Sequence, residues 1–206
     1  MTFYEMIEHY YGKEQRKYIE EALNYDPVYA QRFNRLKPFD PEFASDISFL
    51  NPKLEIPENY PQAVTHPFHH AGAYYLQDPS ATLAVEFMDL QADDIVLDLC
   101  AAPGGKSTEI LNQIPDGFLI ANEINPKRNQ RLQFNLNRWG HENVVVTQMS
   151  GTDLADQLEN RFDKVLLDAP CSAEGLVRRN PDLIESYQLE HAYEYQKIQK
   201  ALLEDA

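Results

Sequence analysis

The chain has 206 residues, enough for one large domain or for a large domain with a small one attached. Hydrophobic residues make up 43% and aromatic residues 11%, so the chain can bury a sizeable core and wholesale disorder is disfavoured. The 33 acidic and 18 basic residues give a net charge of −15, which disfavours a non-specific nucleic-acid clamp but leaves room for a local basic patch.

Cysteine content, hydropathy and histidine spacing exclude several further classes. Two cysteines are too few for a disulfide scaffold or a cysteine-rich zinc module. No apolar run approaches the roughly 20 residues of a membrane helix, and no signal peptide opens the sequence. His66, His69 and His70 lack acidic or Cys partners at metal-site spacing, so we expect ordinary loop or pocket histidines. We expect a soluble, cytoplasmic monomer without membrane or metal partners.

The N-terminal part, residues 1–79, is rich in Tyr, Pro and charge. Apolar residues at three- and four-residue spacings predict helices over 2–11 and 14–24. Seven prolines between residues 26 and 67 exclude a long helix there and predict short strands and turns. We therefore expect a small α+β module over residues 1–79.

Residues 78–90 predict a helix, with Asp78 as its N-cap and Pro79 in its first turn. From residue 93, short apolar runs alternate with helical patterns. The runs predict strands over 95–100, 118–122, 143–148 and 164–169, and the helices are predicted over 106–113, 127–139, 152–158 and 182–203. Such alternation predicts a parallel sheet covered on both faces, so we expect an α/β fold with a Rossmann-like domain over 80–206.

A glycine-rich turn follows the first of these strands: Asp98-Leu99-Cys100-Ala101-Ala102-Pro103-Gly104-Gly105-Lys106. Glycines let a ligand approach the backbone, and the helix that follows offers free N–H donors. The alternative is a tight turn that serves packing only. Glu123 ends the second strand 18 residues after Gly105, close to the roughly 20-residue offset at which an acid meets a ribose hydroxyl.

The turn matches neither GxGxxG nor GxxxxGK[ST], so neither a dinucleotide nor a triphosphate is indicated. An adenosyl cofactor without phosphates fits better. Ile124, directly after the acid, would pack against an adenine or else form part of the core.

The fourth predicted strand runs into Asp168-Ala169-Pro170-Cys171-Ser172-Ala173-Glu174-Gly175. If the sheet is wound as predicted, Asp168 and Cys171 lie at the same edge as the glycine turn. The alternative is a buried strand end with an inert cysteine. Arg178 and Arg179 follow as a local basic cluster, which is either a phosphate contact or a solvated surface.

The segments LDLCAAPGGKS, ANE and LLDAPCSAEGLVRRNPD together resemble the RNA cytosine-5 methyltransferases of the RsmB/NOP type, with the bacterial RsmF-like ribosomal RNA enzymes as the nearest group. RFNRLK at 32–37 and HHAGAYYLQDPSA at 69–81 are similar to two upstream segments of that family. The likeness covers about residues 30–185, and the core motifs are specific in combination. It implies a methyltransferase domain with about four of the seven strands of its sheet.

The resemblance implies S-adenosylmethionine as cofactor and RNA, in particular ribosomal RNA, as substrate. The implied cofactor-binding residues are Cys100, Ala101, Ala102, Pro103, Gly104, Gly105, Lys106, Glu123, Ser150 and Asp168. Asp168 would also contact the target base, Cys171 would help to release the product, and Arg178 and Arg179 would contact RNA. Ser150 stands where the family often has Asp, so Asp153 is an alternative adenine contact.

Cytosine C5 is too weak a nucleophile to take a methyl group unaided, and a thiolate that adds to C6 activates it. The family's nucleophile lies in a later Thr-Cys motif, which these residues lack, and Cys100 belongs to the cofactor turn. Because strand 164–169 would also be left as an edge, we expect a fragment without its nucleophile. The alternatives are an inactive module that binds cofactor or RNA, and a methyltransferase for another substrate.

Overall fold

The computed structural model describes residues 1–37, 45–47, 54–56 and 60–206. The chain forms two compact units. The smaller unit comprises Met1–Pro27 and Ala169–Glu204, and the larger unit comprises Val28–Asp168 and Asp205–Ala206. The domain boundary between residues 79 and 80 does not coincide with these units and stays a prediction. Within the described part of the chain, no helix is both long and apolar enough to cross a membrane.

The larger unit contains a parallel sheet, whose described strands have the order β7-β6-β5-β8. They are β5 (Ile95–Asp98), β6 (Phe118–Asn122), β7 (Val144–Thr147) and β8 (Lys164–Leu166). Each lies within a run that the sequence predicts as a strand, so the predicted α/β class is confirmed. β8 lies at an edge of this sheet, also as predicted.

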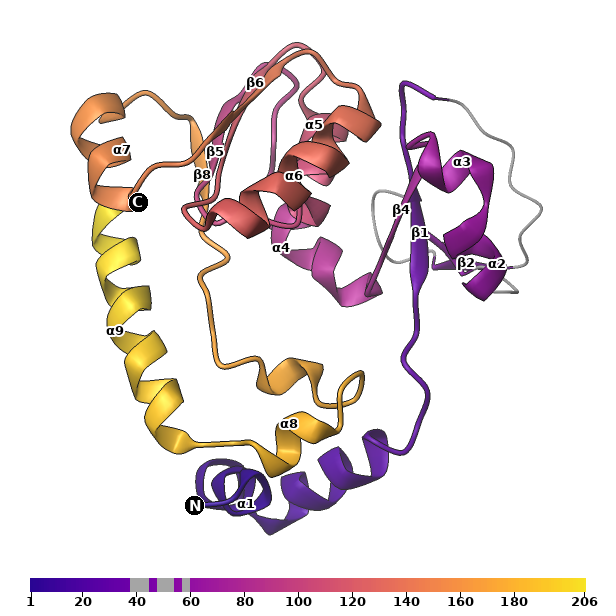
Figure 1. Cartoon of the computed structure of the whole chain (residues 1–206), viewed down its shortest axis with the longest axis vertical. Helices are drawn as coiled ribbons and strands as arrows, with labels where there is room; N and C mark the ends of the chain where they lie inside the picture. The colour runs from indigo at the N-terminus through magenta and orange to yellow at the C-terminus, as the bar shows by residue number, and fades with distance from the viewer. Residues whose placement is uncertain (38–44, 48–53, 57–59) are drawn as a thin grey trace. The chain divides into compact units, whose positions relative to one another are not determined.

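Three helices connect these strands: α5 (Gly105–Gln113), α6 (Pro126–Trp139) and α7 (Gly151–Leu158). Figure 1 shows α5 and α6 on one face of the sheet and α7 on the other. On α6, the buried residues Leu132, Leu136 and Trp139 recur at four- and three-residue spacings, which places them on one helix face. They pack with Val96 and Leu119 of the strands in the main core.

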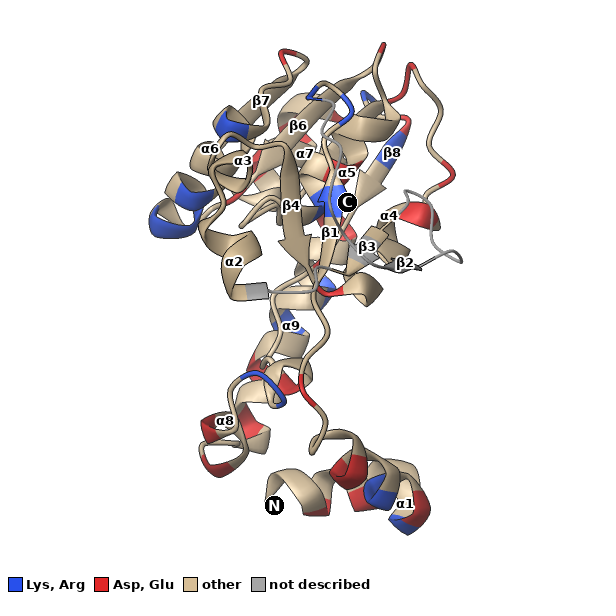
Figure 2. Ribbon diagram, turned by 90° about the vertical axis from the view of Figure 1, so that its right-hand side faces the viewer, with Lys and Arg blue, Asp and Glu red and all other residues tan. Residues whose placement is uncertain are grey.

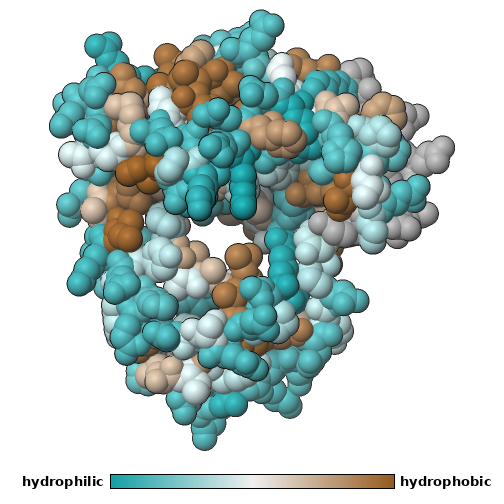
Figure 3. Space-filling view, in the orientation of Figure 1, coloured by the Kyte–Doolittle hydropathy of each residue, from teal (hydrophilic) through white to brown (hydrophobic). Residues whose placement is uncertain are grey.

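Part of the apolar surface of this unit stays exposed. The side chains of Phe118, Phe134 and Val145 are 39%, 64% and 43% exposed. Figure 3 shows a hydrophobic area at the top of the molecule, where Figure 1 draws β6. The described sheet therefore has both an uncovered edge and uncovered apolar side chains.

An antiparallel sheet with the order β2-β3-β1-β4 precedes the parallel one in the chain. Its strands are β1 (Ala30–Phe33), β2 (Ser45–Ile47), β3 (Leu54–Ile56) and β4 (Tyr74–Gln77), and the helices α2 (Tyr60–Thr65) and α3 (Pro67–His70) lie between β3 and β4. The short strands predicted for the Pro-rich stretch are thus confirmed by β1, β2 and β3, whereas its residues 60–65 form the short helix α2, which was not predicted. Residues 38–44, 48–53 and 57–59 of that stretch fall outside the described residues.

The helix predicted over 78–90 is shorter and divided. A 3-10 helix, η1 (Pro79–Thr82), leads into the single-turn helix α4 (Leu83–Glu86). Asp78 is the N-cap, as predicted, and its Oδ1 accepts a hydrogen bond from the Ser80 N–H at 2.9 Å. The helix cannot continue through Asp89, because this residue has a left-handed φ of 51°.

The smaller unit consists of helices. α1 (Phe3–Ala22) joins the two predicted N-terminal helices and is interrupted at Gly12. η2 (Glu174–Leu176), α8 (Asp182–Glu185) and most of α9 (Leu189–Asp205) form the rest. The single helix predicted over 182–203 is therefore wrong. Tyr187, between α8 and α9, packs against the buried Phe3 and Val177, and this tertiary contact outweighs the local helical pattern.

Candidate cofactor site

The glycine turn after β5 presents its backbone at the carboxyl edge of the parallel sheet. Gly104, the residue before α5, has a left-handed φ of 105°, and the Ala102-Pro103 peptide is cis. Because the first N–H groups of a helix lack acceptors within the helix, residues 105–107 offer donors at this edge. The turn thus has the backbone arrangement that the sequence predicts for a ligand site.

Asp98, the last residue of β5, supplies a buried carboxylate below the turn and is only 1% exposed. Its Oδ2 accepts a hydrogen bond from Ser107 Oγ at 2.7 Å, and its Oδ1 has no hydrogen-bond partner among the described residues. Burial raises the pKa of Asp98 to about 7, although the Ser107 hydrogen bond and the Lys106 charge oppose this shift. Sequence reasoning gave Asp98 no role, although an acid that ends a buried apolar strand is itself a signal.

Glu123 provides a second buried acid, at the end of the neighbouring strand β6. It is 3% exposed, and its Oε1 accepts a hydrogen bond from the Asn125 N–H at 2.9 Å. Its Oε2 lies 3.3 Å from Arg128 Nη1 but has no hydrogen bond within the described structure. Because β5 and β6 pair in register, with Asp98 opposite Ala121, both carboxylates lie at the same sheet edge.

Lys106 and Asp168 meet at this edge as an ion pair, with Nζ 2.5 Å from Oδ2. Lys106 comes from the first turn of α5, and Asp168 follows β8, which pairs with β5. The structure therefore brings the predicted residues Gly104, Lys106 and Asp168 together with Glu123. Asp168 stays 55% exposed, so it remains accessible to a ligand.

Cys100 lies in the turn but is poorly suited to act as a nucleophile. Burial, together with the charges of the nearby acids Asp98 and Glu123, raises the pKa of its thiol to about 11. The thiol therefore stays protonated near neutral pH, and a thiolate is the reactive form. The adjacent Ala101 and Ala102 are buried. Pro103, in contrast, is exposed.

Ile124 is 61% exposed, so its assignment to the core is wrong and its side chain is free to cover a flat ligand.

The two predicted adenine contacts, Ser150 and Asp153, are hydrogen-bonded to each other. Ser150 is the N-cap of α7, and its hydroxyl donates to Asp153 Oδ2 at 2.6 Å and accepts from the Asp153 N–H at 3.1 Å. The Ser150 hydroxyl proton is thus committed to Asp153, whereas the Asp153 carboxylate can accept further hydrogen bonds.

The other predicted site residues belong to the smaller unit, and their place beside the glycine turn stays a prediction. Cys171 is exposed. Arg178 lines a cavity of about 700 Å³ together with Phe3, Tyr10 and Tyr193. Arg179 is exposed and follows η2.

The histidine cluster predicted for a loop belongs instead to α3, where His66 is the N-cap and His69 and His70 form the last turn. His66 caps α3 through a hydrogen bond with the Phe68 N–H, and His69 Nδ1 lies 2.9 Å from the Val64 carbonyl oxygen. Among the described residues, no group of three or more His, Cys, Asp or Glu side chains is arranged to hold a metal ion.

Helix α6 provides a local basic surface that the sequence interpretation missed. It carries four basic residues and no acid: Lys127, Arg128, Arg131 and Arg138. The first three of these are exposed, and Figure 2 shows the basic segments of α6 in blue. On a chain with a net charge of −15, this helix is a candidate for contact with phosphate groups.

The raised pKa of Asp98 predicts a pH dependence of stability. The pKa is 3.8 in an ordinary setting and about 7 in the fold, so the folded state binds this proton more tightly. The contribution is complete below pH 3.8 and is lost as the pH rises towards 7. We expect the stability of Asp98→Asn relative to the parent to increase from about pH 4 to about pH 7 in urea unfolding, the range between the two pKa values. An equal difference between the two proteins at every pH would contradict the burial effect.

Comparison with solved structures identifies the class of the fold. The structure entitled "Crystal Structure of PH0851" has a TM-score of 0.87 and 25% sequence identity, and the match covers 98% of this chain and 48% of that one. A methyltransferase homologue protein from Pyrococcus horikoshii has a TM-score of 0.74 and 26% identity, with 95% and 64% covered. The chain thus has the Rossmann-like fold of a methyltransferase domain.

Residues 85–206 match the family described as 16S rRNA methyltransferase RsmB/F, and the chain belongs to this family. The ribosomal RNA small subunit methyltransferase F of Vibrio cholerae serotype O1 (strain M66-2) is 39% identical over 141 residues, which are 67% of this chain and 30% of that protein. The enzyme of the same name from Escherichia coli O157:H7 (strain EC4115 / EHEC) is 38% identical, with 67% and 29% covered. The match therefore spans about a third of the length of these relatives.

Proposed function

We propose that the chain binds S-adenosylmethionine at the edge formed by the glycine turn, Asp98, Glu123 and Asp168. The observation that carries this proposal is the pair of buried carboxylates, each with one oxygen that accepts no hydrogen bond within the described structure. The ammonium group and the ribose hydroxyls of this cofactor are donors that match such oxygens. Its carboxylate matches the N–H donors that begin α5.

The charge at this edge favours a cofactor without phosphates. Three carboxylates, Asp98, Glu123 and Asp168, surround the turn, and Lys106 is already paired with Asp168. A nucleotide phosphate would meet repulsion from these acids, whereas a cationic ligand would be attracted. ATP and NAD are therefore expected to bind much more weakly than S-adenosylmethionine.

When bound, S-adenosylmethionine supplies an electrophilic methyl group. The residues of the chain hold the cofactor and orient it. Glu123 accepts hydrogen bonds from the ribose hydroxyls, Asp98 accepts one from the amino group, and the N–H groups of residues 105–107 donate to the carboxylate. Asp168, which is the most exposed of the three acids, lies beside the cofactor and also faces the acceptor base.

As the acceptor we propose cytosine C5 in ribosomal RNA. Support comes from the Asp-Ala-Pro-Cys motif at 168–171 and from the printed names of the family and of the relatives. Cys171 assists product release, and Arg178 and Arg179 contact RNA. Because its pKa is raised and its thiol stays protonated, Cys100 is unsuited to supply the thiolate that activates C6. The lack of a reactive thiol at Cys100 also favours a second candidate function, that of an inactive module that binds cofactor or RNA.

Calorimetric titration tests the cofactor assignment. We expect the chain to bind S-adenosylmethionine, and Asp168→Ala to weaken binding by about tenfold, since the loss of one charged contact costs roughly 1.5–3 kcal/mol. Asp93→Ala, which removes an exposed acid preceding β5, is the matched control and should bind like the parent. Equal affinity of the parent for ATP would contradict the assignment.

Methyl transfer to 16S ribosomal RNA tests the cytosine-5 assignment and the role of Cys171. The chain alone is expected to form no 5-methylcytosine, because it lacks a second reactive thiol. A methyl-labelled cofactor with nucleoside analysis of the RNA measures this outcome. If the chain did form 5-methylcytosine and Cys171→Ser abolished it, Cys171 would be the nucleophile, and the proposed role in product release would be wrong.

A further inference from the structure

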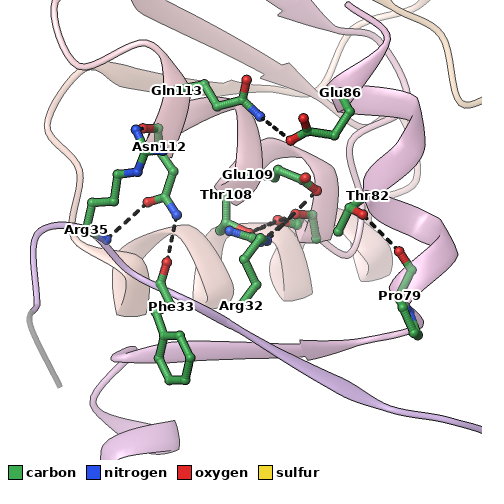
Figure 4. Close-up of polar contacts among 12 residues, drawn as sticks. Arg32, Phe33, Arg35, Pro79, Thr82, Glu86, Thr108, Glu109, Asn112 and Gln113 are labelled. Atoms are coloured by element: carbon green, nitrogen blue, oxygen red, sulfur yellow. Dashed lines mark hydrogen bonds and ion pairs between the residues drawn. The ribbon is translucent and has the colours of Figure 1, made fainter. Parts of the chain in front are cut away.

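The RFNRLK segment at 32–37 contacts the start of α5. Arg32 lies in β1, and its side chain is 0% exposed. Its Nη2 donates to the Gly105 carbonyl oxygen at 2.9 Å and to Thr108 Oγ1 at 2.6 Å. Figure 4 shows the Arg32 side chain pointing towards Thr108 and Glu109 on α5.

These contacts fix the orientation of the peptide groups that begin α5. Thr108 Oγ1 lies within hydrogen-bond distance of the Gly104 and Gly105 carbonyl oxygens, at 2.8 and 2.9 Å. A peptide group is planar, so a fixed Gly105 carbonyl also fixes the N–H of Lys106, and a fixed Gly104 carbonyl fixes the N–H of Gly105. Those N–H groups are the donors that the cofactor site offers.

The same segment also holds the far end of α5. Asn112 Nδ2 donates to the Phe33 carbonyl oxygen at 2.8 Å, and Arg35 Nη1 donates to the Asn112 carbonyl oxygen at 2.9 Å. Figure 4 shows Phe33 and Arg35 approaching Asn112 from the β1 side. With Arg32 at one end and these contacts at the other, the whole helix is held against β1.

The position of the Arg32 charge, buried near the N-terminus of α5, is electrostatically unfavourable. A cation near a helix N-terminus opposes the helix dipole. Glu109 offsets this charge, with its Oε2 3.9 Å from Arg32 Nε and both side chains 0% exposed. The rings of Trp139 and Tyr75 lie 5.1 and 5.7 Å from the guanidinium carbon. A buried ion pair contributes little net stability, and its best-attested benefit is conformational specificity.

We propose that Arg32 is a positioning residue for the cofactor turn, because it holds the Gly105 carbonyl and so aims the N–H donors of α5 at the ligand. This inference rests on the proposed cofactor site. It assigns the guanidinium a role at the site without contact with the cofactor.

The test compares Arg32 variants with a matched change in the same segment. Asn34 donates to the Gly72 and Trp139 carbonyl oxygens, away from the turn, so Asn34→Ala removes buried hydrogen bonds without touching α5. Arg32→Met combined with Glu109→Leu removes both charges and keeps the fold, since such pairs are replaceable by apolar side chains. We expect calorimetric affinity for S-adenosylmethionine to fall about tenfold or more in this double variant, to recover partly in Arg32→Lys, and to stay within about twofold in Asn34→Ala.

Amide hydrogen exchange of the free chain provides a readout that needs no cofactor. The amide of Thr108, which donates to the Gly104 carbonyl oxygen at 2.9 Å, should exchange faster in the double variant, while the amides of α6 stay protected and Asn34→Ala resembles the parent. Parental exchange and parental affinity in the double variant would overturn the inference, as would an affinity that falls equally in Asn34→Ala. If the parent itself binds no S-adenosylmethionine, the proposed function fails, and the exchange experiment still decides the positioning role.

Discussion

Arg32→Met is expected to lower the free energy of unfolding by about 3–5 kcal/mol, the cost of leaving one partner of a buried ion pair uncompensated. Burial lowers the pKa of Arg32 only to about 10, so the side chain is charged at neutral pH. Its loss leaves Glu109 buried without a cation and removes the donor to Gly105 and Thr108. Urea unfolding measures the effect, and the single tryptophan, Trp139, is a fluorescent reporter next to the guanidinium.

The double variant Arg32→Met with Glu109→Leu distinguishes the loss of the Arg32 charge from the loss of its packing. Burial raises the pKa of Glu109 and the charge of Arg32 opposes this shift, so the loss of Arg32 raises that pKa further. The cost of Arg32→Met should therefore shrink as the pH falls and the uncompensated acid takes up a proton. Adding Glu109→Leu should restore most of the lost stability. A double variant no more stable than Arg32→Met, with no pH dependence, would show that the ion pair is not the cause.

Glu123→Ala is expected to weaken S-adenosylmethionine binding by about 100-fold, since two hydrogen bonds to a charged group contribute roughly 1.5 kcal/mol each or more. The ribose hydroxyls would lose both acceptor oxygens. Arg128, which lies 3.3 Å from Oε2 and also donates to the Ala102 carbonyl, would lose its acidic partner beside the turn. Calorimetry on a variant shown to be folded by circular dichroism measures the effect.

Two control variants accompany Glu123→Ala: the same substitution at another glutamate and a milder substitution at Glu123 itself. Glu142→Ala removes an exposed acid beyond α6 and should leave the affinity unchanged. Glu123→Gln keeps one acceptor oxygen and should fall between the parent and Glu123→Ala. An affinity of Glu123→Ala within about threefold of the parent, which is less than a single hydrogen bond is worth, would remove Glu123 from the site.

The parallel sheet was predictable because each of its strands is a short apolar run that ends at a turn or an acid. β6 has the predicted bounds, whereas β5 ends at Asp98 rather than at Cys100, because the chain leaves the sheet to form the turn. Helices that depend on tertiary contacts were predicted less well. The spacing of apolar residues over 182–203 cannot show that Tyr187 packs against Phe3, far away in the sequence.

The sequence motifs predicted where the candidate site lies, but not which of its polar groups are buried and which contacts they make. Glycine spacing and the offset of Glu123 indicated a nucleotide site without any structure. The spare oxygen of Asp98 and the contact of Arg32 with the Gly105 carbonyl depend on burial and on residues 73 positions apart. No local pattern carries that information, because it arises only when β1 packs against α5.

The most direct test of the central claim, that the turn after β5 and the acids beside it form an S-adenosylmethionine site, is a nuclear magnetic resonance titration. Amide nitrogen–proton spectra of the chain are recorded while the cofactor is added. The largest saturable shifts are expected at residues 99–102 and 104–107, at Glu123 and Ile124, and at Asp168. Saturable shifts confined to other residues, or no shifts in a chain whose spectrum shows it to be folded, would contradict the account.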